Sequence, residues 1–544
     1  MIAVRFLGTT PESSTVYRTL ASLSRQLIHL CGLQGKFPDI PQEFSDLKDL
    51  FKDILAAIPK EKRVVMYVDS LDQLSEANGA HKLAWLPLPL PSNVKLVLSV
   101  LPNKHFILRT LRGIMPQEEQ YVKVSNLKTE TSHMIIKRWL EMSRRKLSEK
   151  QEAQIDKLIA KDVTPLYLKL VFDEIQSWKS FETSDLECAT IKDCLTRLYH
   201  RLETKHGKIL VSRSLAYLSA SCSGLTQLEM EDILSLDEEV LTDVYQFHIP
   251  PIRRLPSILW ARVRRDLNEY IVDREADGTK VMAWYHRQFI ETANERYLGL
   301  GISFTGRQSR DEYKRIYLAL RDYFAGIWAG NVPKPFKYTQ WQMKKLKITS
   351  KYGREIRYVS PQPNIYRTID GTIDIDNPRY NLRKLSELPS VCDSLDTQSI
   401  GFITKHIVMN PEFLCAWIKN KRWEEISEFI SEFLTASEHI DQSITLTKIY
   451  KKQFDGEALT EEDRDKLSNV ESILTGEHGG ICLQAQLIHS CLLLSYISVL
   501  QNPTFLAVDM CGRLLPYKGI LRGIDEWIRY CEKGTPRNIF QKVV

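Results

Sequence analysis

The sequence lacks the features that mark secreted and membrane proteins. Its ten cysteines include no Cys-x-x-Cys pair, and nothing at its N-terminus reads as a cleavable signal, which favours a reducing compartment. Its most apolar late stretch, residues 487–500, is too short for a membrane span and contains a histidine and three serines. We therefore expect a cytoplasmic protein with no membrane span.

The sequence also lacks an excess of charge of one sign. Its 74 basic and 68 acidic residues leave a formal net charge of only +6, which implies no strong attraction to nucleic acid or to a membrane. The chain has 544 residues, of which 43% are apolar, and this predicts a globular protein of about three or four domains. The net charge therefore favours no particular class of binding partner.

A third absence concerns phosphate binding. A phosphate-binding loop needs Gly-x-x-x-x-Gly-Lys followed by Ser or Thr, because its amides surround the phosphates and its hydroxyl reaches Mg²⁺. The nearest string, residues 32–37, has the wrong spacing and ends in Phe37. In P-loop folds this loop follows the first strand, whereas this chain opens directly on a predicted strand at residues 2–7. We therefore expect the sequence to be a fragment that lacks an N-terminal strand and loop.

What the sequence does contain is an apolar run that ends in an acid. Residues 63–74 read Arg-Val-Val-Met-Tyr-Val-Asp-Ser-Leu-Asp-Gln-Leu, which places Asp69 at the end of a predicted strand and Asp72 three residues later. Such a run suits a strand buried in a parallel sheet, and ligands of these sheets gather at the carboxyl ends of the strands. An acid there can hold a metal-bound water near phosphates. The alternative is a surface turn whose aspartates only cap the next helix.

The order of predicted elements indicates an α/β region followed by mostly helical regions. Strands alternate with helical patterns such as residues 17–31, which is typical of an α/β parallel sheet. The predicted strands are residues 2–7, 63–68, 94–101 and 121–124. Late in the chain, predicted helices look like successive antiparallel hairpins without a repeat period, at residues 413–417, 423–433, 484–500 and 524–530.

Residues 207–300 have the pattern of a winged helix. Thr226 and Glu229 form a predicted capping box at the start of one helix. Two short strands, residues 270–273 and 280–284, follow further on and are joined through Asp277-Gly278. Helices followed by a hairpin make a winged helix.

A winged helix raises the alternative of nucleic-acid binding. Such a domain can place a helix in the DNA major groove, and five arginines precede the wing. They are Arg253, Arg254, Arg262, Arg264 and Arg265. Because acids interleave with these arginines, we expect a solvated, ion-paired surface rather than a stripe that follows phosphates.

Several longer strings are specific enough to compare with known families. They are residues 5–15 (Arg-Phe-Leu-Gly-Thr-Thr-Pro-Glu-Ser-Ser-Thr), 68–74, 95–99 (Lys-Leu-Val-Leu-Ser), 284–289 (Trp-Tyr-His-Arg-Gln-Phe), 296–298 (Arg-Tyr-Leu) and 380–389 (Tyr-Asn-Leu-Arg-Lys-Leu-Ser-Glu-Leu-Pro). Together they resemble the NACHT NTPase module and, more narrowly, the NACHT and WD-repeat domain-containing proteins. The resemblance implies a signal-transduction ATPase whose nucleotide state governs a closed-to-open switch and assembly with protein partners or with itself.

The resemblance assigns roles to five positions. Asp69 would hold Mg²⁺ and, with Asp72, form the catalytic acid motif, while Ser99 would end the sensor strand. Pro165 would pack near the adenine of ATP or ADP, and His286 would reach the β-phosphate when the winged helix closes. Without the resemblance, the proline reads as the first residue of a helix and the histidine as a helix cap or a packed side chain.

Departures from the family pattern weaken the expectation of rapid hydrolysis. Val100-Leu101-Pro102 follows Ser99 where many relatives have an arginine, so γ-phosphate sensing by that residue is in doubt. Gln73 replaces an acid that often ends the aspartate motif, which removes one potential base. Whether the chain is an enzyme stays open. We expect slow or absent turnover and weak or no binding of ATP, ADP and Mg²⁺ by this chain alone.

The predicted fold is multidomain, α/β and then mostly α. It comprises a partial P-loop NTPase parallel sheet at 1–125, a helical lid at 126–206, a winged helix at 207–300, a helix and connector at 301–390, and an α-helical superhelical region at 391–544. No propeller-blade pattern occurs before Val544, so the WD-repeat propeller is also expected to be missing. We predict a nucleotide-dependent switch and assembly scaffold. The alternatives are a helical interaction scaffold with a vestigial nucleotide fold, and a winged-helix nucleic-acid binder.

Overall fold

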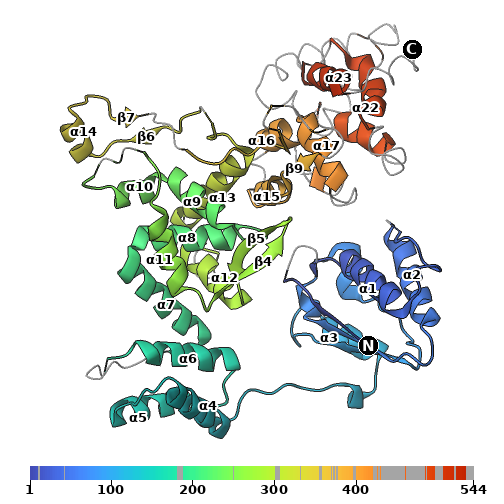
Figure 1. Cartoon of the computed structure of the whole chain (residues 1–544), viewed down its shortest axis with the longest axis vertical. Coiled ribbons are helices and arrows are strands. Elements are labelled where there is room, and N and C mark those ends of the chain that lie inside the picture. The colour runs from blue at the N-terminus through green and yellow to red at the C-terminus, as the bar shows by residue number, and fades with distance from the viewer. Residues whose placement is uncertain are drawn as a thin grey trace. The chain divides into compact units, whose positions relative to one another are not determined.

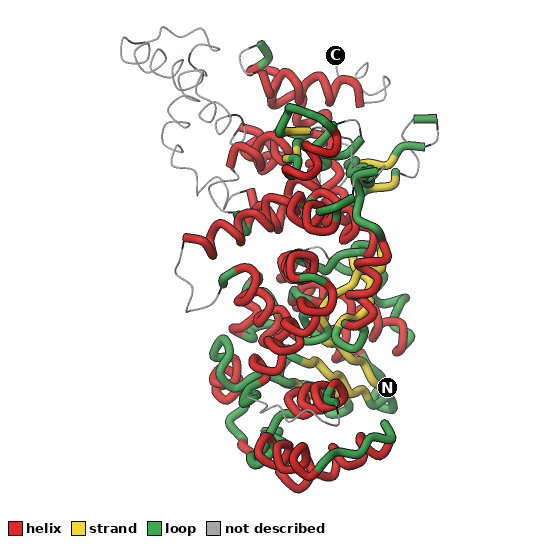
Figure 2. Tube along the Cα trace, turned by 90° about the vertical axis from the view of Figure 1, so that its left-hand side faces the viewer, coloured by secondary structure: helices red, strands yellow, loops and turns green. Residues whose placement is uncertain are grey.

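The computed structural model describes most of the first 420 residues and parts of the rest. The described ranges are 1–420, apart from gaps at 10–12, 42, 180–187, 249, 251, 301–306, 331, 354–357, 369, 372–373, 375–377 and 396–399, and then chiefly 487–495, 506–519 and 522–534. The chain divides into two compact units. The first comprises Met1–Ile191 with Arg274–Ala276, and the second comprises Lys192–Asp273 and Asp277–Val544. Helices predominate throughout these residues (Figure 2).

The first unit contains a parallel sheet of three strands (Figure 1). Its strands are β1 (Ile2–Phe6), β2 (Val64–Asp69) and β3 (Val94–Leu98), in the order β1-β2-β3. The register pairs Val4 with Tyr67, and Tyr67 with Val97. Because all three strands run in the same direction, their carboxyl ends meet at one edge of the sheet, as the alternating pattern predicted.

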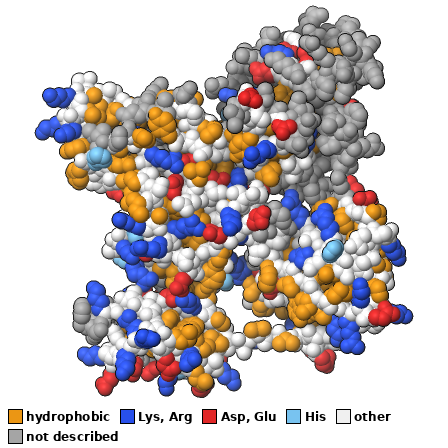
Figure 3. All heavy atoms as spheres, in the orientation of Figure 1, with side chains coloured by type: hydrophobic (Ala, Val, Ile, Leu, Met, Phe, Trp, Pro, Cys, Tyr) orange, Lys and Arg blue, Asp and Glu red, His pale blue; other side chains and the backbone are white. Residues whose placement is uncertain are grey.

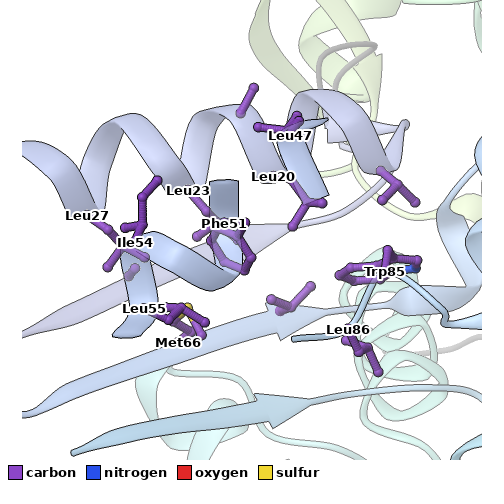
Figure 4. Packing of buried hydrophobic residues seen from close by; sticks show 14 of the residues in the cluster. Leu20, Leu23, Leu27, Leu47, Phe51, Ile54, Leu55, Met66, Trp85 and Leu86 are labelled. Atoms are coloured by element: carbon purple, nitrogen blue, oxygen red, sulfur yellow. The ribbon is translucent and has the colours of Figure 1, made fainter. Parts of the chain in front are cut away.

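Two helices cover one face of this sheet. They are α1 (Val16–Cys31) and α2 (Phe44–Ala57). Figure 4 shows apolar side chains from both helices, Leu23 and Phe51 among them, packed over Met66 of β2. The ends of α1 follow from its sequence, because the Thr15 hydroxyl caps its start and Gly32 ends it in the left-handed conformation. The sheet therefore rests on a closely packed apolar layer.

The predicted strand at 121–124 is wrong. This segment lies outside the sheet, and its side chains Val122 and Val124 are 87% and 91% exposed. Alternation of apolar and polar residues gives a segment β-propensity, but a strand also needs a neighbouring chain to pair with. No described strand offers that pairing here, so the segment remains an extended connection.

A group of helices follows the sheet in the first unit. Pro165 begins the last of them, and Thr164 caps it, in the usual arrangement of a proline in a first turn. The helices are α3 (Ile107–Ile114), α4 (Thr129–Met142), α5 (Glu149–Leu158) and α6 (Pro165–Ser177). The helical character predicted after residue 128 is confirmed.

The second unit begins with the winged helix. The capping box of Thr226 and Glu229 is present, and the hairpin turns through Asp277 and Gly278, both with positive φ. This is the pattern that a two-residue turn of type I′ requires. Its elements are α7 (Ile191–His206), α8 (Lys208–Ala220), α9 (Gln227–Leu236), α10 (Glu238–Val244), α11 (Ser257–Asp266), β4 (Ile271–Ala276), β5 (Thr279–Trp284) and α12 (Arg287–Ala293).

The remainder of the second unit is helical, with short strand pairs between the helices. The helices are α13 (Arg307–Ala325), α14 (Gln340–Leu346), α15 (Leu382–Asp393), α16 (Ile400–Ile403), α17 (Pro411–Asn420), α22 (Leu506–Leu514) and α23 (Arg522–Gly534). The predicted helices at 413–417 and 524–530 fall within α17 and α23, whereas most of 423–433 and part of 484–500 lie outside the described residues. The superhelix stays a prediction. In the described part of the chain, no helix combines the length and hydropathy that crossing a membrane requires.

Candidate functional site

The carboxyl ends of β2 and β3 bring polar side chains together. Ser99 directly follows β3, and its hydroxyl donates a 2.5 Å hydrogen bond to Oδ1 of Asp69. The backbone N–H of Ser70 donates to the same Ser99 hydroxyl at 2.7 Å. The Ser70 hydroxyl in turn donates to Oδ2 of Asp69 at 3.2 Å. Asp69 and Ser99, the two site residues predicted from neighbouring strands, therefore lie side by side at one edge of the sheet.

Asp72 has a different environment from Asp69. It is only 7% exposed and lies in the short helix Leu71–Gln73. Its Oδ1 accepts a hydrogen bond from the backbone N–H of Leu101 at 3.3 Å, and its Oδ2 accepts from the side-chain amide of Gln73 at 2.6 Å. These bonds tie the turn after β2 to the turn after β3. Asp72 therefore has a structural function, and its catalytic role stays a prediction.

The loop after β1 reaches the same edge of the sheet. Gly8 has a φ of +69°, and a Cβ at this position would lie 2.5 Å from Cβ of Gln73, so only glycine fits. The backbone N–H of Leu7 donates to the carbonyl oxygen of Asp69 at 3.1 Å. Gly8 is not among the predicted site residues, although a glycine directly after a predicted strand was the signal available. The loops after β1 and β2 are therefore held closely together.

Pro165 lies in the first turn of α6, a helix that follows the sheet in the sequence. The hydroxyl of Thr164 accepts a hydrogen bond from the backbone N–H of Tyr167 at 3.3 Å, which is the usual cap of such a helix. The local structure accounts for the proline without a ligand. Its contact with an adenine stays a prediction.

His286 lies in the second unit, where it caps the start of α12. Its Nδ1 accepts a hydrogen bond from the backbone N–H of Gln288 at 3.3 Å, so the neutral ring carries its proton on Nε2. Burial, and then the charge of Arg287, lowers the pKa of His286, which keeps the ring neutral at pH 7. Across the described residues no hydrogen bond to Nε2 occurs. The side chain therefore caps a helix with one nitrogen and presents an N–H donor with the other.

The edge of the sheet fits a magnesium ion better than it fits a nucleotide. Mg²⁺ is commonly held by one or two carboxylates, with water and phosphate oxygens completing its octahedron. Asp69 is a partly exposed carboxylate beside two hydroxyls, which suits one ligand of such an ion. A nucleotide also needs amides around its phosphates, and the described residues contain no loop of that pattern. Asp69 therefore suits one ligand of the metal, and its role in binding Mg²⁺ and a nucleotide stays a prediction.

A hollow in the first unit lies at the C-terminal end of α1. It has a volume of about 410 Å³ and is lined by the end of that helix and the loop that follows, with Arg25, Phe37 and Asp39 among its residues. None of the predicted site residues lines it. The hollow is therefore not part of the predicted nucleotide site at Asp69.

Three of the five arginines before the wing pair with acids of the second unit. Arg264 donates to both carboxylate oxygens of Asp273, at 2.8 and 2.9 Å. Arg253 is buried and pairs with Glu238. Arg254 pairs with the buried Asp232 at 2.5 Å. On the face that Figure 3 shows, basic and acidic side chains are interspersed over this domain. Three of the five arginines are therefore bound within the protein, which argues against a surface that follows phosphates.

Helix α15 supplies a buried arginine that is not among the predicted site residues. Arg383 is 7% exposed, and its guanidinium donates to both carboxylate oxygens of Glu229 at 3.0 Å. It also donates to Glu387 at 3.1 Å, to the Ser223 hydroxyl at 2.8 Å and to the carbonyl oxygen of Gly224 at 2.7 Å. Burial alone would lower the pKa of Arg383, but the charges of Glu387 and Glu229 outweigh burial and raise it. Arg383 therefore ties α15 to the winged helix as a permanent cation.

Comparison with known proteins agrees with this architecture. Residues 184–302 match the family described as NWD1-like, winged helix-turn-helix domain. NACHT and WD repeat domain-containing protein 2 of Mus musculus is 32% identical over 342 residues, which are 62% of this chain and 19% of that protein. NACHT domain- and WD repeat-containing protein 1 of Homo sapiens is 31% identical over 391 residues, which are 71% of this chain and 23% of that protein.

A more distant relative aligns over less of the chain. Telomerase protein component 1 of Mus musculus is 27% identical over 225 residues, which are 39% of this chain and 8% of that protein. The chain spans about a fifth of the length of the first two relatives. The resemblance seen in the sequence strings is confirmed: the chain is homologous to the NACHT and WD repeat domain-containing proteins and carries an NWD1-like winged helix domain.

Proposed function

We propose that the chain is the switch region of a NACHT-type signal-transduction NTPase, in which the bound nucleotide controls assembly. The observation that carries this proposal is the pair of Asp69 and Ser99, hydrogen-bonded at the carboxyl ends of adjacent parallel strands. Homology to proteins whose names include a NACHT domain supports it. Function would then depend on which nucleotide is bound more than on how fast it is hydrolysed.

In this proposal each site residue has one physical task. Asp69 is a ligand of Mg²⁺, and Ser99 fixes the orientation of that carboxylate through their hydrogen bond. His286, whose Nδ1 is used in capping α12, would donate its Nε2–H to the β-phosphate of bound ADP and so hold the winged helix in the closed state. Exchange of ADP for ATP would release the winged helix and expose surfaces for assembly. A ligand shifts such an equilibrium only by its different affinities for the two states.

Rapid hydrolysis is not part of the proposal. A general base must reach the attacking water, but the carboxylate of Asp72 is buried and accepts hydrogen bonds from Leu101 and Gln73. This observation also favours the second candidate, a helical interaction scaffold with a vestigial nucleotide fold. The two candidates differ in whether nucleotide changes the assembly state.

The proposal is tested by adding a phosphate-binding loop to the chain. The chain alone should bind MgATP and MgADP poorly, because it keeps the magnesium acid without the loop amides. Joining a strand and a phosphate-binding loop to the N-terminus of the chain should confer binding. A ligand at 100 times its Kd stabilises a fold by about 2.7 kcal/mol, which thermal melts detect. The measurements are melting temperature and oligomer mass with ADP and with ATP.

The matched control for this experiment is Asp69→Asn, which removes the carboxylate charge at constant size. It should abolish the Mg²⁺-dependent part of the melting shift in the extended chain. A clear Mg²⁺-dependent shift in the chain alone would contradict the prediction of weak binding. If the extended chain binds nucleotide but its oligomer mass is the same with ADP and ATP, the scaffold candidate is favoured over the switch.

Binding to duplex DNA should be absent or weak at physiological salt. Three of the arginines near the wing are already paired, and a protein that follows phosphates needs free cations that release counterions. Fluorescence anisotropy at two salt concentrations measures this directly. Submicromolar, sequence-selective affinity that is lost when Arg262, Arg264 and Arg265 are changed to Ala would favour the nucleic-acid binder instead.

A further inference from the structure

A cluster of side chains of metal-ligating type shares no residue with the Asp69–Ser99 pair. Glu76, His81 and His105 each offer one ligand atom, and these three atoms lie within 4.8 Å of one another. Glu76 and His81 belong to the loop between β2 and β3, and His105 to the turn before α3. In the part of the chain that the structure describes, no other three His, Cys, Asp or Glu side chains are grouped in this way.

Hydrogen bonding prepares His81 to bind a metal. Its Nε2 lies 2.9 Å from the carbonyl oxygen of Leu74, and because a carbonyl can only accept, Nε2 carries the ring proton. The lone pair of the neutral ring is then on Nδ1, which lies 4.0 Å from Oε1 of Glu76. Metal-bound histidines almost always donate their other N–H to a carboxylate, a backbone carbonyl or water. The carbonyl oxygen of Leu74 therefore holds His81 in the tautomer that a metal ligand needs, with the lone pair on Nδ1.

The segment that carries His81 is anchored in the core. The indole N–H of Trp85 donates to the carbonyl oxygen of Ala80 at 2.9 Å, and Ala80 is fully buried. His81 itself is 13% exposed, whereas the side chain of Glu76 is 85% exposed. The backbone is thus fixed by buried neighbours while the carboxylate remains free to turn towards the ring.

The turn before α3 places His105 against His81. The two imidazole rings stack with their centroids 4.2 Å apart and an angle of 19° between their planes. His105 and Phe106 both adopt left-handed φ angles, of 49° and 56°, and the fully buried Ile107 follows them. Residues other than glycine keep such conformations only when their surroundings enforce them. The fold therefore holds the two histidines together although they come from different loops.

We infer that Glu76, His81 and His105 form a three-ligand site for Zn²⁺. Two imidazoles and one carboxylate are a zinc-type donor set, whereas Mg²⁺ and Ca²⁺ prefer oxygen ligands. Zinc–ligand bonds of about 2.0–2.2 Å in a tetrahedron place ligand atoms roughly 3.3 Å apart, so the present cluster must contract by about 1.5 Å. Because the lone pairs lie in the ring planes, His105 must also turn out of the stack before both rings face one ion. The exposed side chains of Glu76 and His105 allow these movements. A fourth position remains for water, and the ion links the two loops.

The test is a titration of the whole reduced chain with CoCl₂ and with ZnCl₂. Cobalt reports tetrahedral coordination by its visible absorption, and calorimetry gives the affinity for zinc. The variants are Glu76→Gln and His105→Gln, because both side chains are exposed and their loss should leave the fold intact. Each should weaken zinc binding by at least about 10-fold, since even partners of metal ligands contribute 10- to 100-fold. Excess Mg²⁺ should not displace the bound ion.

The matched control is His133→Gln, an exposed histidine on α4 that lies 3.6 Å from Asp156. This variant should bind zinc as the unchanged chain does. Circular dichroism establishes that all three variants remain folded. The inference is overturned if the chain takes up no zinc. It is also overturned if Glu76→Gln and His105→Gln bind zinc with the affinity of the unchanged chain, because the ion would then use other ligands such as the cysteines.

Discussion

Replacing Arg383 by Met is expected to destabilise the second unit by about 3–5 kcal/mol, which is the usual cost of breaking a buried ion pair by removing one partner. The substitution would leave the carboxylates of Glu229 and Glu387 buried without a cation, at 6% and 0% exposure. It also removes the donors that satisfy Ser223 and the carbonyl oxygen of Gly224. Met is close to Arg in volume, so loss of packing is a minor part of the effect.

Hydrogen exchange read by mass spectrometry is the suitable measurement, because it reports local opening within a chain of more than one unit. Peptides from α9, β5 and α15 should lose protection together, whereas peptides from the sheet of the first unit should not change. Arg265→Met is the matched control, because this side chain is 77% exposed and its nearest acid is 4.0 Å away. If both substitutions have the same small effect, the Arg383 network contributes little to stability.

The second large effect is expected from His286→Ala in the chain to which a phosphate-binding loop has been joined. Loss of one hydrogen bond to a charged phosphate costs about 1.5–3 kcal/mol, so ADP should dissociate roughly 10- to 150-fold faster. Assembly should also become easier, because the contact is made only in the closed state. Stopped-flow release of a fluorescent ADP analogue and measurement of oligomer mass test both consequences.

His286→Asn separates the proposed contact from helix capping. Asparagine is among the best N-cap residues, so this variant should keep α12 capped while losing the Nε2 donor. If capping is the only task of His286, the asparagine variant should retain ADP as well as the unchanged chain. If both variants release ADP rapidly while remaining folded, the contact with phosphate explains the loss.

Features that depend on neighbouring residues could be predicted from the sequence. Asp69 at the end of β2, the capping box of Thr226 with Glu229, and the turn at Asp277-Gly278 all follow from short patterns, and all three are present in the structure. Each depends on backbone propensity or on a hydrogen bond across a few residues. Such signals do not require knowledge of how the chain folds back on itself.

Features that depend on distant residues could not be predicted in the same way. The pattern at 121–124 favoured a strand, but whether a strand forms is decided by a partner elsewhere in the chain. Asp72 is separated from its partner Leu101 by 29 residues, and Arg383 from Glu229 by 154. His81 and His105 likewise meet only because their two loops fold together. One sequence without its tertiary contacts contains no signal for these pairs.

Helix α15 contacts the turn of the wing, between β4 and β5, and this contact can form only after α15 has been synthesised. Asp277, at the turn of the wing, accepts hydrogen bonds from Ser386 and from Arg383, which lies 106 residues further along the chain. A ribosome adds about 5–20 residues per second, so α15 leaves it roughly 5–20 s after the wing does. Throughout that interval the carboxylates of Asp277 and Glu229 have not met their arginine. The winged helix therefore reaches its full stability only after α15 has emerged and Arg383 has paired with these carboxylates.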